Sequence, residues 1–195
     1  IRDRNSTAYY FSVASSSIAN FFDEMYLNTP WEQHYNNLDG RTILDRLASV
    51  KYFVVKKGKE SDLPYGYSRL SGEAEKNGKT YLAYADEDAL PLGYTYDSWI
   101  SREDYDKMTV TEKQQALLQG VVLDDSSLPE TETHFNDREV SYYTSEGKGC
   151  RLKNGKVVVT QENAQLKLVF KGEENAETYL ITEGLDYDCL LYTSP

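Results

Sequence analysis

The chain contains 195 residues, of which 39% are hydrophobic and 27% are charged. This composition can build a hydrophobic core and predicts a folded protein of one large or two small domains. The 32 acidic and 21 basic residues give a net charge of −11, which argues against phosphate backbones and anionic membrane surfaces as partners. We therefore expect no nucleic-acid partner.

The sequence has no recognisable targeting or membrane-crossing segment. It begins with the polar residues Ile1-Arg-Asp-Arg-Asn-Ser6, which lack the apolar centre of a signal peptide. Apolar runs such as Phe53-Val-Val55 are far shorter than the roughly 20 residues of a membrane helix. Together with the missing initial Met, these features lead us to expect a soluble piece of a larger protein.

The first third of the chain predicts alternating strands and helices. Residues 8–13 are aromatic and β-branched and indicate a strand. After them, apolar residues recur at helical spacing, so one face of an amphipathic helix ending near Asn28 is predicted; they are Ile18, Phe21, Phe22 and Met25. A second helix is predicted over residues 41–49, with Asp39 as its N-cap, followed by a core strand over residues 50–55.

The middle third combines turn signals with two capping boxes. The Asn77-Gly78 pair predicts a hairpin before a strand over residues 80–84. Pro91 and Gly93, within Ala89-Leu-Pro-Leu-Gly-Tyr-Thr-Tyr96, predict a tight start to a further core strand. Two helix starts are predicted by capping-box spacings, Ser101 with Asp104 and Thr109 with Glu112.

The last third predicts β structure. Residues 124–139 contain Pro129 and many carboxylates without periodicity, and we interpret them as an acidic, exposed connection. Six strand-like runs follow, at the spacing typical of a sandwich, over residues 140–143, 150–153, 156–160, 165–170, 178–182 and 187–192. The predicted fold is therefore α+β: an α+β region over residues 1–123, the connection, and an antiparallel, jelly-roll-like β-sandwich over residues 140–195. Whether the sandwich shares one core with the early strands stays open.

No constellation of residues indicates catalysis or a metal. Carboxylate pairs are too common in this chain to mark a glycosidase dyad, which requires a set separation in space. His34 and His134 have no partners at zinc-ligand spacing, and Asp86-Glu-Asp88 lacks the spaced ligands of a calcium loop. Nucleophile-elbow and phosphate-loop motifs are also missing. We expect no catalytic residue, no metal and no cofactor in this chain.

Five aromatic or imidazole side chains form the best candidate for carbohydrate binding, because a flat ring can stack on a sugar. They are Tyr9, Tyr10, Trp31, His34 and Tyr35. The alternative is structural, since a loop tryptophan more often fixes its loop to the domain. The same choice applies to the 17 tyrosines, which suit either half-exposed strands or sugar-stacking surfaces.

Cys150 and Cys189 both lie in predicted strands. A disulfide between them needs Cα atoms about 4.4–6.8 Å apart, which the sequence does not fix. We favour two buried free thiols.

Three segments in order resemble the extracytoplasmic part of the YfhO-like bacterial membrane proteins. They are Phe11-Ser-Val-Ala-Ser-Ser-Ser17 leading into Phe21-Phe22, then Leu44-Asp-Arg-Leu-Ala-Ser-Val-Lys-Tyr-Phe-Val-Val55, then Tyr84-Ala-Asp-Glu-Asp-Ala-Leu-Pro-Leu-Gly-Tyr94. The similarity spans about Tyr9 to Trp99. One departure is Asp86, where the family pattern leads us to expect asparagine, and another is the long glycine-containing excursion before Tyr84.

The resemblance implies more than the residues do. YfhO-like proteins are multispan membrane proteins of the C-type glycosyltransferase superfamily, which transfer a sugar from a lipid-phosphate carrier to surface polymers such as lipoteichoic acid. Their expected catalytic carboxylate lies in an early loop that is absent here, so no catalytic residue is transferred. The chain would be an outward-facing domain at the extracytoplasmic face of the membrane, flanked by membrane helices and placing or recognising the acceptor polymer.

Two rival functions remain. One is a secreted glycan-binding or adhesive module that works through tyrosine and tryptophan surfaces. The other is an autonomous hydrolase, which the lack of a catalytic constellation makes the weakest reading.

Overall fold

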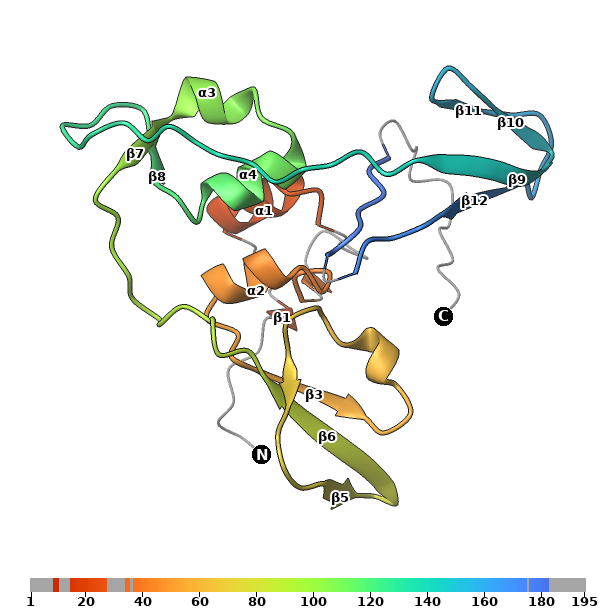
Figure 1. The fold of residues 1–195 in the computed structure, drawn as a ribbon, viewed down its shortest axis with the longest axis horizontal. Helices are drawn as coiled ribbons and strands as arrows, with labels where there is room; N and C mark the ends of the chain where they lie inside the picture. The colour runs from red at the N-terminus through yellow and green to blue at the C-terminus, as the bar shows by residue number, and fades with distance from the viewer. Residues whose placement is uncertain (1–8, 11–14, 28–33, 36, 175, 183–195) are drawn as a thin grey trace. The chain divides into compact units, whose positions relative to one another are not determined.

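A computed structural model describes residues 9–10, 15–27, 34–35, 37–174 and 176–182 (Figure 1). The chain divides into two compact units, Ile1–Arg138 and Glu139–Pro195. The first contains helices and strands, and the described part of the second contains strands. The predicted α+β class is confirmed.

Four short helices of the N-terminal unit surround one hydrophobic core. They are α1 (Ser16–Glu24), α2 (Thr42–Leu47), α3 (Arg102–Asp106) and α4 (Val110–Ala116). The predicted apolar face of α1 is confirmed, because Phe22 and Met25 are buried in this core and Ile18 and Phe21 pack against it. Leu44 of α2 and Tyr105 of α3 are buried in the same cluster.

Both predicted capping boxes open helices. Ser101 Oγ accepts a hydrogen bond from the Asp104 backbone N–H at 3.1 Å, and the reciprocal box between Thr109 and Glu112 is complete. The prediction that Asp39 caps α2 is wrong, because the N-cap is Arg41. Asp39 has a φ of +55° within a left-handed turn before the helix and lies 3.8 Å from the Arg41 guanidinium.

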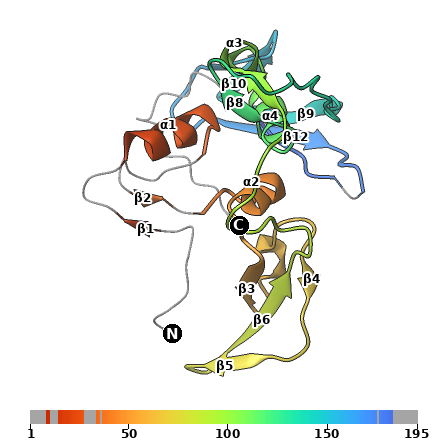
Figure 2. The ribbon, with the colours of Figure 1, turned by 90° about the vertical axis from the view of Figure 1, so that its left-hand side faces the viewer.

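A four-stranded antiparallel sheet carries a second core. Strand β6 (Lys79–Ala85) pairs with β3 (Tyr52–Lys56), β4 (Ser68–Arg69) and β5 (Ala74–Lys76), and Figure 2 shows β6 between β3 and β4. The buried face contains Val55, Tyr67, Leu82 and Tyr84. Strand β3 is a core strand on this face alone, since Tyr52 is 61% exposed.

The predicted strand after Pro91 is wrong. Residues 89–98 form no strand, and β7 (Trp99–Ser101) begins later. The segment instead follows α2: the Leu90 N–H donates to the Arg46 carbonyl at 3.2 Å, and Ser49 Oγ donates to the Pro91 carbonyl at 2.9 Å. These bonds hold the backbone against a helix, and Leu92 is left 90% exposed.

Strand β7 pairs in parallel with β8 (Val121–Leu123), and α3 and α4 form the crossover that a parallel pair requires. The acidic connection lies along β7, because Trp99 donates to the Pro129 carbonyl at 3.0 Å and accepts from the Thr131 N–H at 2.7 Å. Gln119 then forms two hydrogen bonds with the His134 backbone. Residues 129–134 are therefore attached to the first unit, although many of their side chains are exposed.

The described part of the C-terminal unit contains two antiparallel pairs. Strand β9 (Tyr142–Lys148) pairs with β12 (Gln165–Phe170), and β10 (Cys150–Lys153) pairs with β11 (Lys156–Val159). The predicted strand over residues 178–182 is wrong, since these residues are irregular and Leu180 is 73% exposed. The predicted strand over residues 187–192 lies outside the described residues, and a sandwich or jelly roll is not confirmed.

A short strand pair is also described near the N-terminus. Strand β1 (Tyr9–Tyr10) pairs antiparallel with β2 (His34–Tyr35).

Cys150 Sγ donates to the Gln165 carbonyl at 3.1 Å. Cys150 is half-buried, so the prediction that it is buried is wrong. Cys189 lies outside the described residues, and its state is not tested.

The docking of the connection on β7 can be tested at Gly120. A Cβ added there would lie 2.9 Å from Thr131 Oγ1 and 3.1 Å from Ile100 Cγ1, so we expect Gly120→Ala to lower the free energy of unfolding by about 1–2 kcal/mol. Gly93→Ala is the matched control, because a Cβ at Gly93 meets nothing within 4 Å. Urea unfolding of both variants checks this, and equal midpoints would contradict the described packing of Thr131.

Candidate functional site

A shallow hollow of about 570 Å³ lies between α1 and the start of α3. Four of its lining residues come from α1 at spacings of three, four and seven, so they form one stripe of the helix. The lining residues are Ser17, Asn20, Phe21, Glu24 and Arg102. These residues lie one position before those of the buried face of α1 (Ile18, Phe21, Phe22 and Met25), so the two faces are adjacent. Phe21 lies at the edge of both.

Two cations fix the carboxylate at the end of α1. Glu24 Oε1 accepts hydrogen bonds from Arg102 at 3.2 Å and from Lys113 at 3.3 Å. The same two cations lie 5.3 Å and 5.2 Å from the ring centre of buried Tyr105. Burial raises the pKa of Tyr105 well above its usual range, and the nearby Glu24 charge adds to this rise. Three elements are thereby held in one arrangement around the hollow.

The chemistry of this lining suits a ligand rich in hydroxyl groups. It presents an aromatic edge, a hydroxyl, an amide, a carboxylate and a guanidinium, so donors and acceptors surround an apolar surface. Glu24 is engaged by two cations, which makes it a positioned acceptor. Within the described ranges, no group of three or more His, Cys, Asp or Glu side chains could hold a metal ion.

The structure describes only in part the five residues that the sequence predicts to bind carbohydrate. The β1–β2 pairing brings together the backbones of four of them, with Tyr9 opposite Tyr35 and Tyr10 opposite His34. Trp31 lies outside the described residues. Their role in carbohydrate binding stays a prediction. Sequence reasoning missed the hollow, although the spacing of Ser17, Asn20, Phe21 and Glu24 along α1 was a readable signal.

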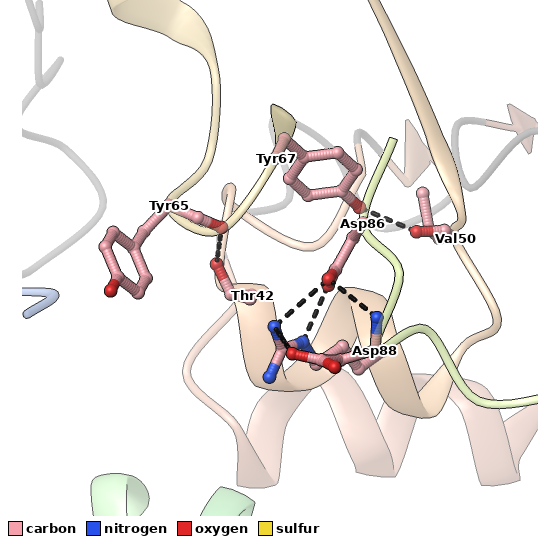
Figure 3. A network of polar contacts seen from close by, with 7 residues as sticks. Thr42, Val50, Tyr65, Tyr67, Asp86 and Asp88 are labelled. Atoms are coloured by element: carbon pink, nitrogen blue, oxygen red, sulfur yellow. Dashed lines mark hydrogen bonds and ion pairs between the residues drawn. The ribbon is translucent and has the colours of Figure 1, made fainter. Parts of the chain in front are cut away.

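A second polar network joins α2 to the end of β6 (Figure 3). Arg46 Nε donates to Asp86 Oδ2 at 2.6 Å, and Arg46 Nη2 donates to Asp86 Oδ1 at 3.1 Å and to Asp88 Oδ2 at 2.8 Å. Asp86 also accepts from the Asp88 backbone N–H at 3.0 Å. A buried carboxylate is tolerated here because its oxygens receive donors from a guanidinium and a backbone amide.

The loop segments around Asp86 are held by hydrogen bonds from two side chains. The Tyr67 hydroxyl donates to the Val50 carbonyl at 2.7 Å, and Thr42 Oγ1 donates to the Tyr65 carbonyl at 2.6 Å (Figure 3). Burial raises the pKa of Tyr67, and the charges of Asp45 and Asp86 raise it further. Gly66 has a φ of +86°, and a Cβ there would lie 3.3 Å from Arg46 Nη2, so glycine lets this loop approach the guanidinium.

Burial alone would raise the pKa of Asp86, which is 2% exposed. The hydrogen bonds from Arg46 and the Asp88 N–H, with the charge of Arg46, outweigh this effect and lower the pKa below its usual value. The hydrogen bond to Asp86 in turn raises the pKa of Arg46. The pair is therefore ionised at neutral pH.

Comparison with known proteins identifies the family. The model of the family described as "Bacterial membrane protein YfhO" matches residues 2–187. The chain belongs to the YfhO family. It is 25% identical over 162 residues to the "Uncharacterized protein YfhO" of Bacillus subtilis (strain 168), an alignment that covers 82% of this chain and 18% of that protein. No solved structure matches the chain.

In this YfhO family member, two of the three segments that carried the resemblance meet in the Asp86 network. Arg46 belongs to the segment Leu44–Val55, and Asp86 and Asp88 belong to the segment Tyr84–Tyr94. These segments therefore have an architectural role in this chain. None of the helices within the described ranges combines the length and apolar character needed to cross a bilayer.

Replacing Asp86 tests this network. Asp86→Asn keeps one acceptor and removes the charge, so we expect the free energy of unfolding at pH 7 to fall by about 1.5–3 kcal/mol, the range for a hydrogen bond to a charged group. Asp88→Asn is the matched control: it also loses an Arg46 contact, but its side chain is 73% exposed, and the expected loss is under about 1 kcal/mol. Equal losses in urea unfolding would contradict the structural role of Asp86.

Wild type and Asp86→Asn should also differ in how their free energy of unfolding depends on pH. Folding lowers the pKa of the Asp86 carboxyl. Its contribution to folding stability is therefore complete above the pKa of the unfolded state, about 3.9, and is lost as the pH falls through the pKa of the folded state. The stability gap between wild type and Asp86→Asn should therefore shrink below about pH 4. A gap that stays constant down to acid unfolding would contradict the lowered pKa.

Proposed function

We propose that this chain is the acceptor-recognising, extracytoplasmic part of a YfhO membrane glycosyltransferase. The rest of that protein would transfer a sugar from a lipid-phosphate carrier, and this part would place a cell-surface polymer such as lipoteichoic acid. The family match through residues 2–187 supports a membrane protein as the parent. The small share of the Bacillus subtilis relative that the chain covers, 18%, is consistent with one part of a larger protein.

The hollow beside α1 is the observation that carries the recognition role. A polymer of sugars or polyols offers hydroxyl groups and apolar C–H faces, and the lining of Ser17, Asn20 and Phe21 with the charged Glu24 and Arg102 matches both. The open form of the hollow suits a chain passing across it, of which one unit at a time is contacted. The paired backbones of β1 and β2 hold Tyr9, Tyr10, His34 and Tyr35 in one short ladder, and in this proposal these residues give the polymer a further contact.

In this proposal the carboxylate of the hollow has a binding role. Glu24, the carboxylate of the hollow, is engaged by Arg102 and Lys113, so it serves as a fixed hydrogen-bond acceptor for a substrate hydroxyl. Sugar transfer would then require residues of the parent protein outside this chain. The fragment alone binds but does not turn over.

Removing hydrogen-bonding groups from the hollow should weaken glycan binding. We expect Ser17→Ala/Asn20→Ala to raise the dissociation constant for wall-polymer fragments about tenfold, because each lost hydrogen bond weakens binding by about 0.5–1.5 kcal/mol. Ser16→Ala is the control, since Ser16 is exposed on the same helix and does not line the hollow. Calorimetric titration measures the change.

The same titration with Trp31→Ala tests the aromatic set. Binding that is lost on this change, with unfolding unaltered, would support Trp31 and its neighbours as a stacking surface. Saturable binding that none of these variants alters would contradict the proposed site. Release of sugar by the purified chain would contradict the non-catalytic role.

The location can be tested in the parent protein. An epitope inserted after Gly58, where no atom lies within 4 Å of an added Cβ, should be reached by antibody on intact protoplasts. Reaction only after membrane rupture would contradict the extracytoplasmic placement. Membrane helices encoded on both sides of this segment are expected as well.

A further inference from the structure

The hairpin of β10 and β11 concentrates positive charge in an acidic chain. Between residues 147 and 161 there are four cations and no carboxylate, namely Lys148, Arg151, Lys153 and Lys156. Lys167 and Lys171 follow, with Glu162 as the one carboxylate up to residue 171, so residues 147–171 carry a net charge of +5. The other residues carry −16.

These cations lie at the surface of the described residues. All six are exposed, and none of them forms an ion pair within the part of the chain that the structure describes. By contrast, cations of the first unit such as Arg46, Lys57 and Arg102 lie close to carboxylates. Among the described side chains, the cations of this hairpin and of the strands that flank it therefore lack the ion pairs found in the first unit.

The same hairpin also exposes aliphatic side chains. Val157, Val158 and Val159 are 52%, 37% and 64% exposed. Strand β11 is paired on one side by β10, and no second partner strand appears among the described residues. Three consecutive exposed valines on a strand edge are unfavourable in water and are typical of a surface that another phase or molecule covers.

We propose that the β10–β11 hairpin binds the anionic phospholipid headgroups of the membrane to which the parent protein belongs. Lys and Arg side chains would contact lipid phosphates, and the valines would enter the headgroup layer. Charge complementarity supports this occupant, and the match to a family of bacterial membrane proteins is consistent with a membrane surface nearby. A soluble polyanion would use the cations but would leave the valines in water.

The overall charge of −11 does not contradict this binding. At physiological ionic strength the Debye length is about 8 Å, so acidic groups farther than this from the hairpin are largely screened. A membrane surface in contact with the hairpin therefore interacts mainly with the charges of the hairpin itself. The argument from net charge against anionic membranes therefore applies to the chain as a whole and not to this hairpin.

Vesicle cosedimentation of the 195-residue chain tests the proposal. We expect binding to vesicles of phosphatidylcholine with phosphatidylglycerol, weak binding to phosphatidylcholine alone, and a fall in binding as the salt concentration rises. Each Lys or Arg near an anionic surface strengthens partitioning roughly fivefold. Lys153→Glu/Lys156→Glu should therefore weaken binding by at least about tenfold.

The chain offers a closely matched control. Residues 76–79 and 153–156 have the same sequence, Lys-Asn-Gly-Lys, and both form hairpin turns with positive φ at the central Asn and Gly. Lys76→Glu/Lys79→Glu makes the same charge change beside Glu73 and Glu75 in the first unit, and it should leave vesicle binding within about twofold. Equal losses in the two variants, or binding independent of salt and of phosphatidylglycerol, would overturn the proposal.

Replacing the valines distinguishes membrane binding from binding of a soluble polyanion. Val157→Thr/Val159→Thr keeps β-branching and adds polarity, and it should weaken vesicle binding severalfold without changing binding to polyphosphate. Binding of polyphosphate or duplex DNA as tight as that of the vesicles, with no effect of the threonine variant on either, would overturn the membrane assignment. Docking of the hairpin on the acidic first unit would instead appear as no vesicle binding at any salt concentration, which also overturns it.

Discussion

The ion pair between Arg46 and Asp86 is the contact on which the N-terminal unit depends. It joins Arg46 of α2, near the start of the segment Leu44–Val55, to Asp86, which directly follows β6, and therefore links the helical core to the sheet. Leu90 and Pro91 bond to the backbone or side chains of the same helix region, so the path of the chain after the sheet is set by this contact too. The cost of burying the Asp86 carboxylate is offset by the donors around it.

Local signals in the sequence predicted the parts of the fold that local interactions decide. The capping boxes at Ser101 and Thr109, the Asn-Gly turns and the apolar face of α1 each require only neighbouring residues, and all are present. The strand predicted after Pro91 failed because its backbone bonds to α2, more than 40 residues earlier. The attachment of residues 129–134 to β7 and to Gln119, which follows α4, likewise depends on long-range pairing that no local pattern predicts.

The candidate sites show the same division between local and distant information. The stripe of Ser17, Asn20, Phe21 and Glu24 is helical spacing and could have been read from the sequence, whereas the approach of Arg102 and Lys113 to Glu24 depends on the packing of three helices. The net charge of the whole chain is negative and so does not indicate the basic β10–β11 hairpin, because most carboxylates lie in other parts of the chain. Two of the three segments on which the family resemblance rested join α2 to the end of the sheet, so in this structure they have an architectural role.

The most direct test of the proposed acceptor-recognising role uses the full-length membrane protein in cells. Its Ser17→Ala/Asn20→Ala form should reach the membrane in normal amount but attach less sugar to the surface polymer, measured by mass spectrometry of the isolated polymer. Ser16→Ala should behave as the unmodified protein does. Normal polymer glycosylation by the double variant, at equal protein level, would contradict a role of this hollow in acceptor recognition.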